Sequence, residues 1–174
     1  MKLKLDEADY LAYQLYTASK SPLVAKKKRN GWILSPLIFL LLATLFYSSK
    51  NYALVVYFFV SAVLTAILFP HYFKWRYKRH YKKHIKTHYQ KRFGQEAELN
   101  FTSNGVFYKD ETGEGKINLS EIKQANETAT HFFVELKIGN SLLIPKRELT
   151  SIEEFQAELA ALKIDIINEN DWKW

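Results

Sequence analysis

Two long apolar runs without a charged residue constrain this chain more than any other feature of its sequence. The first extends from Trp32 to Tyr47 and the second from Tyr52 to Phe69, with four residues between them (48–51). With its flanking residues, each approaches the roughly 17–25 residues that an α-helix needs to cross a hydrocarbon core about 30 Å thick. Since 174 residues provide too little protein to bury such a hairpin in a soluble core, we predict a transmembrane hairpin over residues 30–73, with helices at about 31–49 and 52–73.

Charge divides the chain into a basic half and an acidic half. Between Tyr10 and Gln95 there is no Asp or Glu against 15 Lys and Arg, whereas residues 96–174 hold 15 acids and 8 bases. Cations precede the first apolar run and follow the second, while the turn carries only Lys50, so we expect both chain ends in the cytoplasm. The cations predicted to contact anionic headgroups of the inner leaflet are Lys26, Lys27, Lys28, Arg29, Lys74, Arg76, Lys78, Arg79, Lys82 and Lys83.

The apolar runs contain no ionisable side chain of the kind that carries protons or ions, so transport is disfavoured. Small residues at a spacing of four (Ser61 with Thr65, Ala62 with Ala66) predict close contact between helices. Two helices cannot enclose a pore without oligomerising, and homo-oligomerisation stays open.

A basic helix is predicted to follow the membrane segment over residues 74–94, with Pro70 as its break and Gly94 as its C-cap. His80, His84 and His88 share one face at a spacing of four, which makes them weak candidates for metal ligands. Because many cations and no acid lie nearby, we predict neither a metal nor another cofactor. Nucleic-acid binding by interleaved basic and aromatic residues is disfavoured as well, because this helix leaves the membrane directly.

After residue 94 the apolar period changes to the alternation of β-strands. The N-terminal segment Met1–Leu5 alternates too and can add an edge strand, and Asp6 can cap a short helix.

The expected fold is an α+β membrane protein, in which a C-terminal antiparallel sheet or partial barrel is capped by one helix. The predicted regions are 1–29, 30–73, 74–94, a β domain at 95–164 and a tail at 165–174. Within the β domain we predict strands at Glu98–Thr102, Val106–Tyr108, Lys116–Leu119, His131–Ile138 and Ser141–Ile144, turns at 103–105, 112–115 and 139–140, and a helix capped by Ser151 with Glu154.

Four parts of the chain carry a resemblance to a known family: Asp9-Tyr10-Leu11, Glu98-Leu99-Asn100-Phe101, Asn104-Gly105, and the stretch from His131 through Ile144-Pro145-Lys146-Arg147 to Phe155. On these residues the chain resembles the YcxB-like proteins over nearly its whole length. This resemblance implies a bacterial inner-membrane protein with a pleckstrin-homology-like tail and without an established biochemical function. It transfers no active-site residue to this sequence.

No catalytic constellation is recognisable in the sequence. The absence of cysteine excludes thiol nucleophiles and Cys-ligated metals, and His131 is interpreted as a strand-edge histidine. Lys146 and Arg147 follow a predicted strand and are candidates for contact with a phosphate or an acidic partner. We therefore expect a non-enzymatic binding or regulatory module that recognises an unknown protein at the inner leaflet, including a toxin-immunity role. The alternative is an interfacial enzyme that acts on lipids or headgroups through the three helix histidines.

Overall fold

The computed structural model describes residues 1–111 and 113–174, except for the side chain at position 91. The fold is α+β, and helices precede most of the strands. The chain forms two compact units, one made of Met1–Tyr13 with His84–Lys173 and the other of Gln14–Lys83 with Trp174. The helices are α1 (Glu7–Lys20), α2 (Pro22–Ser48), α3 (Tyr52–Tyr89) and α4 (Ile152–Ala161).

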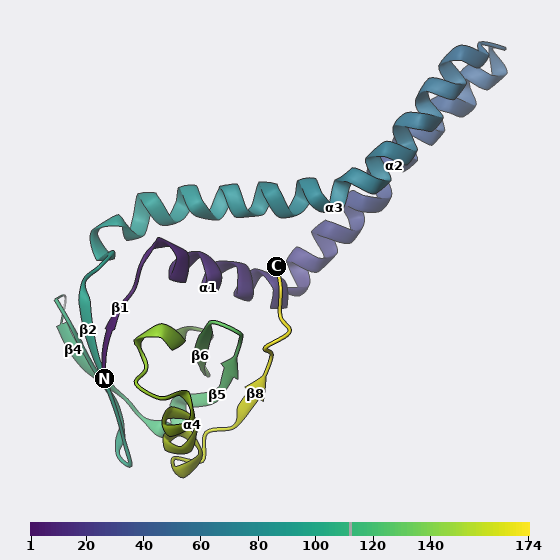
Figure 1. Cartoon of the computed structure of the whole chain (residues 1–174). Helices are drawn as coiled ribbons and strands as arrows, with labels where there is room; N and C mark the ends of the chain where they lie inside the picture. The colour runs from purple at the N-terminus through teal and green to yellow at the C-terminus, as the bar shows by residue number, and fades with distance from the viewer. Residues whose placement is uncertain (112) are drawn as a thin grey trace. The chain divides into compact units, whose positions relative to one another are not determined.

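Among the described residues, α2 and α3 are long and apolar enough to cross a membrane, and they form a hairpin (Figure 1). Helix α2 begins earlier than the predicted residue 31, because the Ser21 hydroxyl accepts a hydrogen bond from the Val24 amide (3.5 Å) and Pro22 fits the first turn. The cations of residues 26–29 are therefore helical. At the other end of the hairpin, the Asn51 side chain caps α3 by accepting from the Leu54 amide (3.3 Å).

Aromatic and small side chains hold α2 and α3 together. Phe58 stacks against Phe46 with ring centroids 5.4 Å apart, and the small side chains of Ala43 and Ala62 are buried. Most of the remaining large apolar side chains of the hairpin are exposed. An outward-facing apolar surface is what helices surrounded by lipid require.

Helix α3 departs from its prediction at two points. It continues through Pro70 instead of breaking there, and Figure 1 shows that α3 bends along its course; proline removes one backbone hydrogen bond and commonly kinks a helix. The helix ends at Tyr89, five residues before Gly94, and the short 3₁₀ helix η1 (Gln90–Arg92) follows. Gly94 adopts a left-handed φ of 72° and donates its amide hydrogen to the Leu5 carbonyl (2.9 Å).

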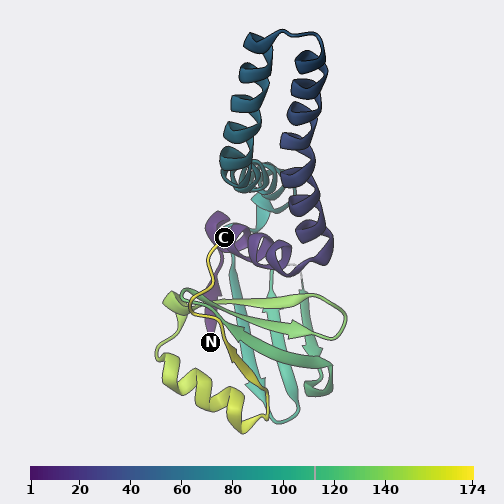
Figure 2. The same cartoon turned by 90° about the vertical axis from the view of Figure 1, so that its right-hand side faces the viewer.

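Two four-stranded sheets form most of the first unit, and their strands run in different directions (Figure 2). The first sheet has the order β1-β2-β3-β4 and the second the order β7-β6-β5-β8. The N-terminal edge strand predicted from the alternation is present, since β1 pairs antiparallel with β2. The strands are β1 (Lys2–Lys4), β2 (Glu96–Thr102), β3 (Gly105–Asp110), β4 (Gly113–Ile117), β5 (Ile122–Glu127), β6 (His131–Leu136), β7 (Ser141–Pro145) and β8 (Ile166–Asn168), with 3₁₀ helices η2 (Leu119–Glu121) and η3 (Lys146–Glu148).

Three strands differ from the sequence-based expectation. The turn predicted at residues 112–115 is wrong for Gly113–Gly115, which begin β4; Thr112 lies outside the described residues. Gly115 is needed in this strand because a Cβ there would collide with the Tyr108 ring on the neighbouring strand. Strand β5 was not predicted, and the predicted tail contains β8, which pairs parallel with β5.

The core of this unit combines side chains from both sheets and α4. Phe155 of α4 meets Phe101 of the first sheet edge to face (5.4 Å) and Phe132 of the second (5.1 Å). The predicted cap of α4 is present, because the Ser151 hydroxyl accepts from the Glu154 amide (3.1 Å). Leu3 of β1 is only 2% exposed within this core, so the N-terminal strand is an integral part of the unit.

Candidate functional site

A buried carboxylate from the N-terminal segment lies at the centre of the first unit. The Asp6 side chain caps α1 by accepting hydrogen bonds from the amides of Ala8 (2.7 Å) and Asp9 (3.0 Å). In return, the Asp6 amide donates to Asp9 Oδ2 (2.7 Å). Asp9 is fully buried (0% exposed), and a buried carboxylate requires compensating partners.

Two residues from the far end of the chain supply those partners. His131, the first residue of β6, places Nε2 at 2.9 Å from Asp9 Oδ1. Arg147 of η3 binds the carboxylate with both terminal nitrogens, Nη1 to Oδ1 and Nη2 to Oδ2, each at 2.6 Å. This bidentate arrangement is among the strongest that a carboxylate and a guanidinium can form.

Asp9 and Arg147 stabilise each other's charged forms. Burial alone would raise the pKa of Asp9, but hydrogen bonds from His131 and Arg147 outweigh it and hold that pKa well below its ordinary value. The hydrogen bonds to Asp9 raise the pKa of Arg147. The other ring nitrogen of His131, Nδ1, lies 2.8 Å from the Thr130 hydroxyl oxygen, so both ring nitrogens have a hydrogen-bond partner.

A second buried ion pair is formed by Lys146, the residue before Arg147 in η3. Lys146 Nζ contacts Glu127 Oε1 of β5 at 2.6 Å, and these side chains are 13% and 6% exposed. The second oxygen of Glu127 accepts from Gln156 of α4 (2.8 Å). The Lys146 ammonium also lies 5.2 Å from the centroid of the Phe132 ring. Lys146 and Arg147 therefore bind two different acids, one from β5 and one from α1.

The chemistry of this cluster favours a structural clamp. Asp9, His131 and Thr130 form a hydrogen-bonded chain that superficially resembles the acid, base and nucleophile of a hydrolase. The bidentate Arg147 neutralises Asp9, however, so this carboxylate is poorly placed to stabilise an imidazolium during proton transfer. Arg147 also bonds the Lys4 carbonyl at the end of β1 (3.3 Å), so the cluster fixes both N-terminal elements of the unit.

The sequence indicated only part of this cluster. Lys146 and Arg147 stood out as two cations after a strand, and their contact with a phosphate or an outside partner stays a prediction. Their intramolecular acids, Glu127 and Asp9, were not predicted as partners. Asp9 and Arg147 are separated by 138 positions, and no local pattern encodes a contact over such a separation.

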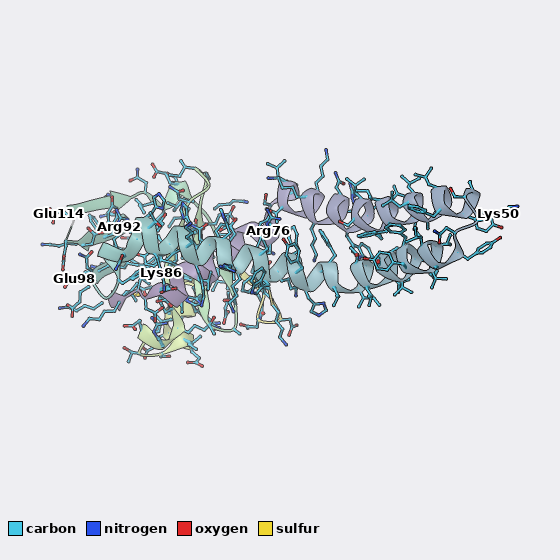
Figure 3. All side chains as sticks on the ribbon, turned by 90° about the horizontal axis from the view of Figure 1, so that it is seen from above. Lys50, Arg76, Lys86, Arg92, Glu98 and Glu114 are labelled. Atoms are coloured by element: carbon cyan, nitrogen blue, oxygen red, sulfur yellow. The ribbon has the colours of Figure 1, made fainter. Side chains whose placement is uncertain are left out.

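The predicted headgroup contacts lie on the hairpin unit. All ten cations of this predicted set are exposed. Arg79 lies over the Trp75 ring (5.3 Å), and Lys74 Nζ donates to the Trp174 carbonyl (2.9 Å). Figure 3 shows Arg76 on α3 and Lys50 at the turn of the hairpin.

The three helix histidines do not come together with acidic ligands. The rings of His84 and His88 stack with centroids 4.3 Å apart, and His88 Nδ1 lies 2.9 Å from the His84 carbonyl oxygen. Over residues 1–111 and 113–174, no group of three His, Asp or Glu side chains is arranged to hold a metal ion.

An open groove of about 470 Å³ lies on the outer face of the first sheet. Asn100, Phe107 and Lys116 are cross-strand neighbours there, and the Lys116 ammonium lies 5.4 Å from the centroid of the Phe107 ring. Phe107 is 43% exposed, which is unusual for a phenylalanine on a charged sheet face. The groove is lined by Glu98, Asn100, Phe107, Tyr108, Lys109, Glu114, Gly115 and Lys116, of which Figure 3 labels Glu98 and Glu114.

Comparison with known families supports the resemblance inferred from the sequence. Residues 101–159 match the family model described as YcxB-like protein. This part of the chain is similar to YcxB-like proteins. The matched region begins within β2 and ends within α4, so it includes His131, Lys146 and Arg147 but not Asp9. Comparisons with curated proteins and with solved structures gave no match.

Proposed function

We propose that this protein is a membrane-anchored recognition module, whose α+β unit binds another protein at the cytoplasmic face of a bacterial inner membrane. Its two four-stranded sheets, which are antiparallel except for the β5–β8 pair, and its helix α4 support a pleckstrin-homology-like arrangement. The observation that carries the proposal is the groove around Phe107, an exposed aromatic side chain surrounded by charges of both signs on the first sheet.

The chain segments that make up the first unit support the proposed orientation in the membrane. Residues 1–13 and 84–173 fold together, while both apolar segments lie between them in sequence. A single compact unit cannot form across a bilayer, so both chain ends belong on one side. The basic flanks of the hairpin favour the cytoplasmic side and anionic lipid headgroups.

The groove has the chemistry of a protein-binding surface. Interfaces commonly surround a partly buried aromatic anchor with polar and charged residues. Here Phe107 is the anchor, Lys116 covers its ring, and the Lys109–Glu114 ion pair (3.7 Å) lies on the neighbouring row. Strand β4 forms one end of the sheet order, so an extended segment of a partner has a backbone edge to pair with beside the groove.

Site-specific photo-crosslinking in intact membranes tests this proposal. A photoreactive phenylalanine analogue replaces Phe107 in the full-length chain, and Ile138, which is 77% exposed in the β6–β7 turn, is the matched control position. We expect a discrete protein adduct from position 107 and none from position 138. The additional change Lys116→Glu should reduce that adduct at least fivefold. Equal adducts from both positions, or none from position 107, would contradict recognition through this groove.

A further inference from the structure

A second pocket lies within the hairpin unit, between the start of α2 and the basic part of α3. Its volume is about 340 Å³. Two of its cations come from different helices, Lys27 from α2 and Arg76 from α3. It is lined by Val24, Lys27, Arg76, Tyr77, His80 and Tyr81.

The lining of this pocket is suited to an anion. Lys27, Arg76 and His80 are exposed side chains with nitrogen donors. Tyr77 and Tyr81 are half-buried beside them, and burial raises the pKa of Tyr81, so its hydroxyl keeps its proton as a donor. Residues 14–83 contain no Asp or Glu, so no acidic side chain of this stretch competes for the cations. The positive end of the α2 dipole adds to the field, because Val24 belongs to the first turn.

The position of Lys27 along α2 fits the depth of lipid headgroups. Lys27 precedes the first apolar run by five residues, which corresponds to about 7.5 Å along a helix that rises 1.5 Å per residue. The headgroup layer on each side of a bilayer is about 5–8 Å thick. Exposed apolar side chains adjoin the pocket in sequence, namely Leu23 (69% exposed), Tyr72 (49%) and Trp75 (56%). The acyl chains of a lipid can contact these apolar side chains, whereas a free inorganic anion gains nothing from them.

We propose that this pocket binds the headgroup phosphate of an anionic phospholipid. Arg76 presents a guanidinium that can bind two phosphate oxygens, and Lys27 adds a point charge from the opposite helix. Tyr77, His80 and Tyr81 complete the site with hydrogen bonds, and the acyl chains extend along the apolar surface of the hairpin. The site requires insertion of the hairpin into a membrane, but it is independent of the protein-binding groove on β3.

Lipid binding by the purified full-length chain tests the site. Native mass spectrometry counts lipids retained from detergent micelles doped with phosphatidylglycerol or phosphatidylcholine. We expect preferential retention of phosphatidylglycerol by the unchanged chain. The double variant Lys27→Gln with Arg76→Gln should bind it at least tenfold more weakly, which corresponds to about 1.4 kcal/mol. The control, Lys137→Gln with Lys163→Gln, removes the same charge from exposed positions outside the pocket and outside the predicted headgroup contacts, and it should change binding less than twofold.

The remaining outcomes discriminate among the sources of binding. Equal losses in the pocket and control variants would overturn the proposal in favour of diffuse charge attraction. Displacement of the lipid by inorganic phosphate at equal concentration would overturn the lipid assignment in favour of a free anion. If the double variant is lost from membranes, Arg76→Lys keeps the charge and should still weaken binding severalfold, and unchanged binding would overturn the site. The Phe107→Ala variant should bind phosphatidylglycerol normally, so failure of the groove and failure of this pocket are distinguishable.

Discussion

Asp9 connects the two ends of the chain through charge. Its carboxylate is fully buried, while the Arg147 side chain that binds it is 47% exposed. If the carboxylate charge is lost, water can hydrate the exposed Arg147 guanidinium. The resulting destabilisation is therefore smaller than for a fully buried ion pair. Water cannot hydrate His131 in the same way, because its side chain is only 7% exposed.

We expect Asp9→Asn to lower the free energy of opening of the first unit by about 2–3 kcal/mol, the range for hydrogen bonds that involve a charged group. Amide hydrogen exchange of β2 and β6 in the full-length chain measures this change. Glu7→Gln is the control, because Glu7 forms a 3.8 Å contact with the exposed Lys86 side chain and should leave exchange nearly unchanged. An Asp9→Asn variant with unchanged protection of both strands would contradict the clamp.

The pH dependence of stability follows from the lowered pKa of Asp9. Because its folded-state pKa lies below its unfolded-state value of about 3.9, the ionised form stabilises the fold. That contribution is fully present above about pH 5 and is lost as the pH falls below about 4 toward the folded-state pKa. We predict a shallower loss of stability between pH 5 and pH 3 for Asp9→Asn than for the unchanged chain, measured by thermal unfolding. Parallel curves would show that Asp9 does not carry this dependence.

Among the elements, β1 is short but contributes a core side chain. Leu3 is 2% exposed, and the N-terminal ammonium of Met1 donates to the Leu99 carbonyl (2.6 Å). The exposed neighbour Lys2 lies on the opposite face of the strand. The strand therefore joins the sheet through one buried leucine as well as its backbone.

We predict that Leu3→Ala destabilises the first unit by about 2–4 kcal/mol, because it removes buried methyl groups and leaves a cavity. Chemical denaturation of the detergent-solubilised chain measures the loss. Lys2→Ala should cost less than about 0.5 kcal/mol, as expected for an exposed position. Similar effects of the two substitutions would show that β1 is not held by its core residue.

The hairpin helices approach closely where Gly31 faces Phe69. A Cβ at Gly31 would lie 2.5 Å from the tip of the Phe69 ring. The indole of Trp32 donates to the Ala66 carbonyl nearby (2.8 Å), which holds α2 and α3 at this separation. Small residues allow such contacts between membrane helices.

We expect Gly31→Val to destabilise the hairpin by about 1–3 kcal/mol through overpacking. The second change Phe69→Ala should restore part of this loss, because it removes the obstructing ring. Melting temperatures of the two single variants and the double variant in detergent form a double-mutant cycle. Strict additivity would contradict direct contact between these residues.

The whole molecule combines one unit built from both chain ends with a hairpin that lies between those ends in sequence. In the proposed membrane orientation, this connectivity requires an even number of crossings, and the two apolar helices match that requirement. It also explains why the N-terminal segment contributes a strand and the Asp9 clamp to a unit formed mostly by the C-terminal half.

Single cysteines test this topology cleanly, because the chain has none of its own. A membrane-impermeant thiol reagent applied to intact cells should label Ser49→Cys in the hairpin turn. It should label Ile138→Cys only after the membrane is permeabilised, because we propose that this unit faces the cytoplasm. Labelling of both positions from outside, or only of position 138, would contradict the proposed orientation.

The sequence alone determined those features that depend on neighbours along the chain. The two apolar helices, the basic flanks, the β2–β3 hairpin and the cap of α4 follow from local periodicity, charge and turn residues. The same local reasoning placed a turn at Gly113–Gly115, because it could not distinguish a glycine needed for a turn from one needed beneath the Tyr108 ring.

Only the tertiary structure decided which distant segments meet. The partners of Lys146 and Arg147, the parallel pairing of β8 with β5 and the pocket between α2 and α3 all join residues far apart in sequence. Such contacts are set by the path of the whole chain and by the burial that it achieves. Periodicity within one segment carries no information about them, because it records only which face of that segment is apolar.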